Sequence, residues 1–327
     1  MSVKKATLVF FVFLSLLTFS LMLAPGHNGD MPFYIAAVFS RSGSTDAEAL
    51  SRAKEVIRAE MPPGQAAAHI NRLDQAEKNL LDFYRIKPLY ISTVSVLHRM
   101  GIPFIPATLI PSLLSFFLIG CIVFSWSSRV FDPLPALVFS ILLMLINPSI
   151  ILSRLSSPDP LSNLFLFGCF YRIYFERDYR PTLLFLILSV FTRLDNIISV
   201  FILLTLMRKW PSRASKTRIP LTVYLPVILL TAVAALWINY YFEGNFWWYT
   251  RISYIRSFAA YGHQVLIYFL SLSESFFPAL LLFCLLVIFK GRLKPGMKSA
   301  RILISIGLIL LVRFLMFPSF EERFQTA

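Results

Sequence analysis

Charged side chains that lie beside apolar segments are the groups in this sequence with the capacity for chemistry. Asp30 and Asp159 are candidate acid or base groups. Several arginines are candidate anion binders, because a guanidinium presents a fixed fork of N–H donors that matches phosphate; they are Arg154, Arg193, Arg313 and Arg323. Together these types would serve proton transfer and the stabilisation of a developing phosphate charge.

Asp30 follows the first apolar segment, 6–23, in a stretch made turn-prone by two glycines, an asparagine and flanking prolines. A single acidic residue in a loop is usually only a solvated charge. Arg313 lies inside the apolar run 308–317. An arginine at such depth indicates a functional site or a side chain that snorkels to the interface, and both readings stay open. The case for either residue depends on the rest of the chain.

Composition defines the class of protein that must position these groups. Of the 327 residues, 57% are hydrophobic, and the mean hydropathy is +0.69. Long apolar runs of this kind predict an all-α polytopic membrane protein with a single transmembrane domain over residues 1–327. The net charge of +14 is explained by Lys and Arg in cytoplasmic loops and at lipid headgroups, and no nucleic-acid-binding module is visible.

Residues 24–102 form the one sizeable polar region, an outer loop after the first span. Thr45 and Glu48 match a capping box that opens a helix ending at Glu60. A second amphipathic stretch begins at Gln65. The two helices would lie on the membrane surface or form a small soluble cap, and the sequence favours neither. Residues 84–100 are too polar for a clear span and are expected to be interfacial or re-entrant.

Apolar length and charge predict about nine hydrophobic passes. The spans are expected at 6–23, 103–124, 134–152, 160–176, 220–242, 264–289 and 300–317, with 182–207 supplying two more. The loops 208–219 and 290–301 each hold five basic residues and should be cytoplasmic. A single helix over 182–207 would place the first of these loops outside, so this segment is expected to fold as a hairpin of two short helices with Arg193 and Asp195 at its tip.

This topology places the N-terminus in the cytoplasm, with the first segment retained as a helix, and gathers the polar candidates on the outer face. Broken helices in membranes usually line a cavity, because free backbone groups find partners there. Phosphate-binding loops, zinc motifs and nucleophile elbows are absent from the sequence. The sequence shows no cofactor requirement, and use of a divalent metal stays open because one confident carboxylate does not define a site.

The order of these features resembles the multi-spanning, lipid-phosphate-sugar-dependent glycosyltransferases of the C-type fold. This group includes the protein O-mannosyltransferases and the enzyme that adds aminoarabinose to lipid A. The resemblance covers nearly the whole chain in short motifs, which are Gly29-Asp30 with Tyr34, Ser157-Pro158-Asp159-Pro160, Thr192-Arg193-Leu194-Asp195-Asn196, and Arg313-Phe314 followed by Pro318. Many relatives carry two adjacent acids at the first motif, whereas this chain has only Asp30.

The resemblance implies transfer of a sugar from a polyprenyl-phosphate donor to a glycan, lipid or protein acceptor outside the membrane, expected to be a bacterial inner (plasma) membrane. Asp30 would be the catalytic base and Asp159 would position hydroxyls. The donor phosphate would meet Arg193, with Arg313 and Arg323, while Tyr34, Asp195 and Arg154 would support the site. Two alternatives stay open: a transporter or flippase for a lipid-linked or anionic solute, and a non-catalytic membrane assembly subunit.

Overall fold

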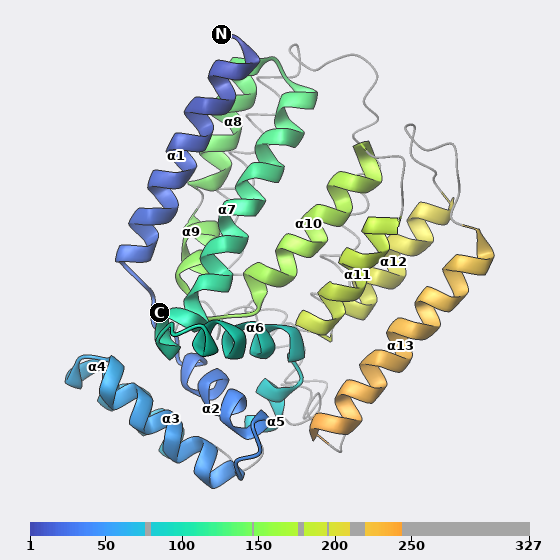
Figure 1. Cartoon of the computed structure of the whole chain (residues 1–327). Helices are drawn as coiled ribbons and strands as arrows, with labels where there is room; N and C mark the ends of the chain where they lie inside the picture. Colours follow the sequence, from blue (N-terminus) through green and yellow to red (C-terminus); the bar gives the residue numbers. More distant parts are fainter. Residues whose placement is uncertain (76–79, 146, 176–179, 195, 210–219, 244–327) are drawn as a thin grey trace, which may run out of the picture.

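The computed structural model describes residues 1–75, 80–145, 147–175, 180–194, 196–209 and 220–243 of the chain. In this part the regular elements are all helices, and Gly26 and Leu155 form an isolated parallel bridge. Figure 1 shows two regions, a bundle of long helices and, at one end of it, a layer of shorter helices. The all-α class predicted from composition is confirmed for the described residues.

The bundle contains the N-terminal helix and the helices that follow the outer loop (Figure 1). Their bounds are α1 Val3–Leu23, α7 Phe104–Val130, α8 Pro133–Met144, α9 Asn147–Arg154, α10 Asp159–Phe175, α11 Arg180–Thr192, α12 Asn196–Lys209 and α13 Leu221–Glu243. Tight packing joins them in places. The rings of Phe10 and Phe124 stack at 4.7 Å between α1 and α7. A Cβ at Gly168 of α10 would lie 2.7 Å from the Phe185 ring of α11, so glycine permits the close approach of these two helices.

The layer of shorter helices, called here the outer layer, comprises α2 Met31–Arg41, α3 Asp46–Glu60, α4 Pro63–Asp74, α5 Leu80–Arg85 and α6 Pro88–Arg99. The capping box predicted for α3 is confirmed: the Glu48 amide donates to Thr45 Oγ1, and the Thr45 amide donates to Glu48 Oε2 at 2.9 Å. At the other end of α3, the Glu60 carboxylate accepts the amides of Phe104 and Ile105, at 3.0 and 2.8 Å. These two bonds fasten the outer layer to the first turn of α7.

Three described helices are long and apolar enough to span a membrane: Val3–Leu23, Phe104–Arg129 and Leu221–Tyr241. α8 and α11 are apolar but shorter. The full set of nine passes therefore stays a prediction, and the spans expected at 264–289 and 300–317 lie outside the described residues. The segment 182–207 forms two helices, α11 and α12. α11 ends at Thr192 and α12 begins at Asn196, where the tip of the hairpin was expected.

Two local expectations need correction, and one helix was not expected. The span expected over 134–152 is two helices, because Pro148 has no backbone N–H and cannot continue the hydrogen bonds of α8. The second amphipathic stretch is also divided, into α4 and α5. α2, which was not expected, begins directly after Asp30, with Pro32 in the first turn where its missing N–H does no harm. The residues of α2 from Met31 to Val38 are all buried, in keeping with their apolar sequence.

Candidate functional site

Asp30 lies directly before α2 and is held from two other helices of the outer layer. The Tyr84 hydroxyl of α5 donates a hydrogen bond to Asp30 Oδ1 at 2.7 Å. Arg72 of α4 places Nη2 4.0 Å from the same oxygen. The side chain of Asp30 is 29% exposed. The carboxylate is therefore oriented by a phenol and a guanidinium while it keeps access to solvent or substrate.

Gly29 allows Arg72 to come so near. A Cβ on Gly29 would overlap the guanidinium of Arg72, which lies against this part of the backbone. Gly29 has no side chain, so the guanidinium of Arg72, and not a second carboxylate, lies next to Asp30.

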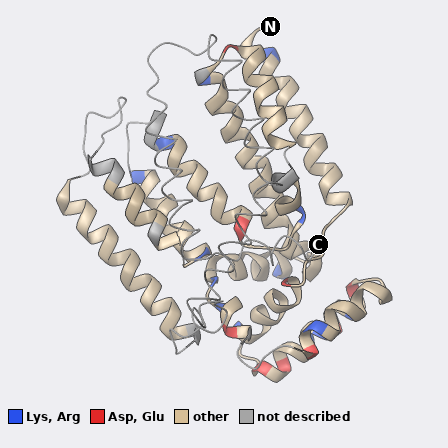
Figure 2. Ribbon diagram, turned by 180° about the vertical axis from the view of Figure 1, so that it is seen from behind, with Lys and Arg blue, Asp and Glu red and all other residues tan. Residues whose placement is uncertain are grey.

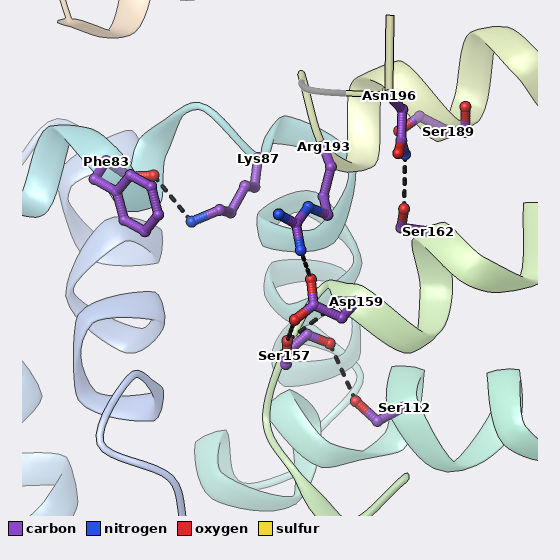
Figure 3. Close-up of polar contacts among 9 residues, drawn as sticks. All are labelled: Phe83, Lys87, Ser112, Ser157, Asp159, Ser162, Ser189, Arg193 and Asn196. Carbon is purple, nitrogen blue, oxygen red and sulfur yellow. Dashed lines mark hydrogen bonds and ion pairs between the residues drawn. The ribbon is translucent and has the colours of Figure 1, made fainter. Parts of the chain in front are cut away.

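Asp159 and Arg193 form an ion pair across two helices of the bundle. Asp159 lies in the first turn of α10, and Arg193 directly follows the last residue of α11. Arg193 Nη1 donates to Asp159 Oδ1, and the two side chains are only 17% and 20% exposed. Ser157 Oγ donates to the other carboxylate oxygen at 2.9 Å. The arrangement is shown in Figure 3.

Bonds from the bundle hold both sides of this ion pair in place (Figure 3). Ser112 of α7 donates its hydroxyl to the carbonyls of Leu155 and Ser157, at 2.7 and 3.1 Å. The Asn196 amide donates to Ser162 Oγ at 2.6 Å and to the Ser189 carbonyl at 2.8 Å. The first set fixes the loop before Asp159. The second ties the start of α12 to α10 and α11, and so fixes the turn that carries Arg193.

Two buried tyrosines, Tyr34 and Tyr90, lie near enough to Asp30 and Asp159 to be affected by both charges. Burial raises the pKa of the Tyr34 phenol well above its ordinary value, and the charges of Asp30 and Asp159 raise it further. The pKa of Tyr90 is also raised, first by burial and then by Asp159 and Asp30. Both carboxylates therefore lie within electrostatic range of the same two phenols. Groups far apart in the sequence converge at the junction of the outer layer and the bundle.

Lys87 is a further member of this cluster that the sequence reasoning missed. It precedes α6 and is only 5% exposed. Its ammonium donates to the Phe83 carbonyl at 3.0 Å and lies 3.6 Å from the centre of the Phe83 ring. The rings of Tyr84 and Tyr34 lie 4.8 and 5.3 Å from it. Because these tyrosines also flank Asp30, the buried ammonium belongs to the same site.

Arg154 binds the backbone of the segment before Asp30. Its Nε donates to the Ala24 carbonyl, and its own carbonyl accepts the Gly26 amide at 2.9 Å. These bonds fix the chain just before Asp30. The predicted site residues Asp195, Arg313 and Arg323 lie outside the described part of the chain. Within the part described, no group of three or more His, Cys, Asp or Glu side chains is placed to share a metal ion.

Comparison of the chain with protein-family models, with curated proteins and with solved structures gives no match. The site offers one partly exposed carboxylate, a second carboxylate paired with a guanidinium, and a buried ammonium, all beside buried phenols. Such a set suits proton abstraction next to a bound anion.

Proposed function

We propose that this protein is a glycosyltransferase that moves a sugar from a polyprenyl-phosphate donor to an acceptor hydroxyl of a glycan, lipid or protein. The observation that carries the proposal is the convergence of Asp30 and the Asp159–Arg193 pair around Tyr34 and Tyr90. A base for the acceptor and a cation for the donor phosphate then lie on one side of the bundle. Helices long enough to span a membrane suit a donor that is anchored in lipid.

In the proposed reaction the Asp30 carboxylate takes the proton of the acceptor hydroxyl as that oxygen attacks the anomeric carbon. The bond from this carbon to the phosphate oxygen breaks, and polyprenyl phosphate leaves with the bonding electrons. Direct displacement inverts the anomeric configuration. Tyr84 and Arg72 keep the Asp30 carboxylate oriented through contacts with Oδ1.

Arg193 stabilises the growing negative charge on the leaving phosphate. A guanidinium has five N–H donors, so it can hold Asp159 and phosphate oxygens at the same time. Asp159 thus positions Arg193 as well as substrate hydroxyls. Lys87 adds a second positive charge to the site, and its location among aromatic rings keeps it from being fully hydrated.

The proposal includes an orientation, with the outer layer on the non-cytoplasmic side. Lys4, Lys5 and Arg180 lie at the starts of α1 and α11, and Arg129 and Arg172 in the last turns of α7 and α10. All five mark the end of the bundle that is away from the outer layer (Figure 1). Figure 2 shows that acidic residues are concentrated in the outer layer. Basic residues in short loops face the cytoplasm, whereas a loop as long as 24–102 contributes little to orientation.

The test uses the full chain in membranes of its native cell, which retain the natural acceptors. Polyprenyl-phosphate sugars of several kinds are added, and release of polyprenyl phosphate is measured. We expect Asp30→Asn to lower the rate by about 100-fold or more, because it removes a general base. Asp74→Asn is the matched control, since Asp74 is an exposed carboxylate of α4 in the same layer.

Two results would contradict the proposal. One is a folded Asp30→Asn variant that transfers sugar at the rate of the unaltered protein. The other is the failure of the unaltered protein to release polyprenyl phosphate from any donor of the series. Arg193→Ala should weaken donor use, and Arg193→Lys should restore part of it, because the ammonium returns the charge without the fork of donors.

A further inference from the structure

A groove of about 930 Å³ lies on another side of the outer layer, between α2, α6, α11 and α13. These four helices can be followed in Figure 1. Arg193, Asp159 and Asp30 are not among its lining residues, so it is separate from the candidate active site. Its wall joins the polar outer layer to two helices of the bundle, and residues that matter for its chemistry are Arg41, Arg85, Ser92, Leu188, Phe191 and Trp237.

One wall of the groove carries two guanidinium groups, those of Arg41 and Arg85. Arg41, in the last turn of α2, donates from Nη1 to the Pro88 carbonyl at 2.9 Å and to Ser92 Oγ at 2.8 Å, which fixes its guanidinium at the edge of the groove. Arg85 also lines the groove, and it is paired with Asp46 and Asp82. Among the described lining residues the charged side chains are the guanidinium groups of Arg41 and Arg85, and Arg41 is the one held by a backbone carbonyl and a hydroxyl.

The opposite wall is apolar and aromatic. α11 contributes Ile187, Leu188 and Phe191, and α13 contributes Trp237 and Tyr241. The rings of Trp237 and Tyr241 stack with their centres 5.2 Å apart. Trp237 is 56% exposed and Tyr241 is 66% exposed. Tryptophan and tyrosine at one end of an apolar helix mark the depth where lipid headgroups meet acyl chains. In a membrane the groove would lie at this depth, with a cation on its polar side.

We propose that this groove binds an anionic membrane phospholipid. The phosphodiester would meet Arg41, with Ser92 beside it, and the acyl chains would lie against α11 and α13. The charge and the aromatic residues occur in the order that such a lipid presents, with the headgroup outermost and the chains next. This site goes beyond the proposed transferase function and does not depend on it. Phe191 is close in sequence to Arg193, so a bound lipid would also brace the end of α11.

The first test measures the thermal stability of the purified full chain in neutral detergent, with added phosphatidylglycerol or phosphatidylcholine. We expect phosphatidylglycerol to stabilise the protein at lower concentration, with a difference that salt diminishes. Arg41→Gln should weaken the response to phosphatidylglycerol about fivefold. Arg99→Gln is the matched control, because Arg99 lies in the last turn of α6 and is not among the groove-lining residues. Inorganic phosphate alone should give no comparable stabilisation, because it lacks the chains.

A second measurement does not depend on Arg41. Phosphatidylglycerol with brominated acyl chains should quench tryptophan fluorescence more than its phosphatidylcholine counterpart, and Trp237→Phe should remove the difference. Leu188→Trp, which fills the groove, should reduce the response to phosphatidylglycerol. Equal responses to the two lipids, or an undiminished response of a folded Leu188→Trp protein, would overturn the proposal. Stabilisation by a soluble anionic peptide in place of lipid would also overturn it.

Discussion

The Asp159–Arg193 ion pair makes a quantitative prediction about stability. Each side chain is about four-fifths buried, so removal of one partner leaves the other charge largely desolvated. Complete burial would make such a loss worth 3–5 kcal/mol, and we reduce this to about 2–4 kcal/mol for the exposed fifth. Asp159→Asn keeps an oxygen for the bond from Ser157, and Arg193→Met keeps the apolar stem, so both variants chiefly remove charge.

The double variant has no buried charge at this position. We therefore expect it to be more stable than the sum of the single losses predicts, with a coupling energy of about 1–3 kcal/mol. Free energies of unfolding are to be measured by titration from mild into denaturing detergent, followed by far-UV circular dichroism. The matched control is the Lys54–Asp74 pair, whose side chains are 25% and 54% exposed. Its coupling should stay below about 1 kcal/mol.

Additivity of the Asp159 and Arg193 losses within about 0.5 kcal/mol would refute this reasoning. Such a result would mean that the two charges are solvated separately. Arg193 would then not be held beside Asp159, and the proposed phosphate site at Arg193 would lose its strongest support.

Two further predictions concern the outer layer. Glu60→Ala should lower the free energy of unfolding by about 1–2 kcal/mol, because two amides at the start of α7 lose their acceptor. The control is Glu55→Ala at an exposed position of the same helix, which should change the free energy of unfolding by less than about 0.5 kcal/mol. Burial, then the charges of His27 and Arg72, lowers the pKa of His69, so the unfolded chain binds the proton first as pH falls. Stability should therefore decrease as pH falls through about 6.5, and His69→Gln should flatten the decrease; identical pH profiles would contradict this.

Much of the bundle follows from apolar length and charge. The break at 193–195 was predicted because a single helix would have placed five basic residues on the wrong side of the membrane. The structure ends α11 at Thr192 and begins α12 at Asn196. The capping box of α3 was equally readable, because it depends on a few adjacent residues. Features that depend on adjacent residues, or on the summed apolarity and charge of a whole segment, can therefore be predicted from the sequence.

The interior of the outer layer was harder to predict, for a physical reason. Amphipathic patterns identify helices that have one wet face. α2 is buried from Met31 to Val38, and its 11 residues are too few to be recognised as a membrane span. Tyr84 reaches Asp30 across a separation of 54 residues, through the packing of α5 on α2. No spacing in the sequence encodes that contact, since it depends on how the two helices are placed by the rest of the layer.

Lys87 shows what a closer reading of local spacing can recover. The segment 84–100 was judged interfacial because of its charges, and Lys87 was one of them. Phe83 and Tyr84 precede it by four and three residues, and α5 ends between them and Lys87, at Arg85. A lysine at these intervals from two aromatic residues can lay its stem over the rings and place its ammonium against them, as the structure shows. A lysine this close in sequence to two aromatic residues, next to an acidic loop, can therefore be a buried cation and not only an interfacial charge.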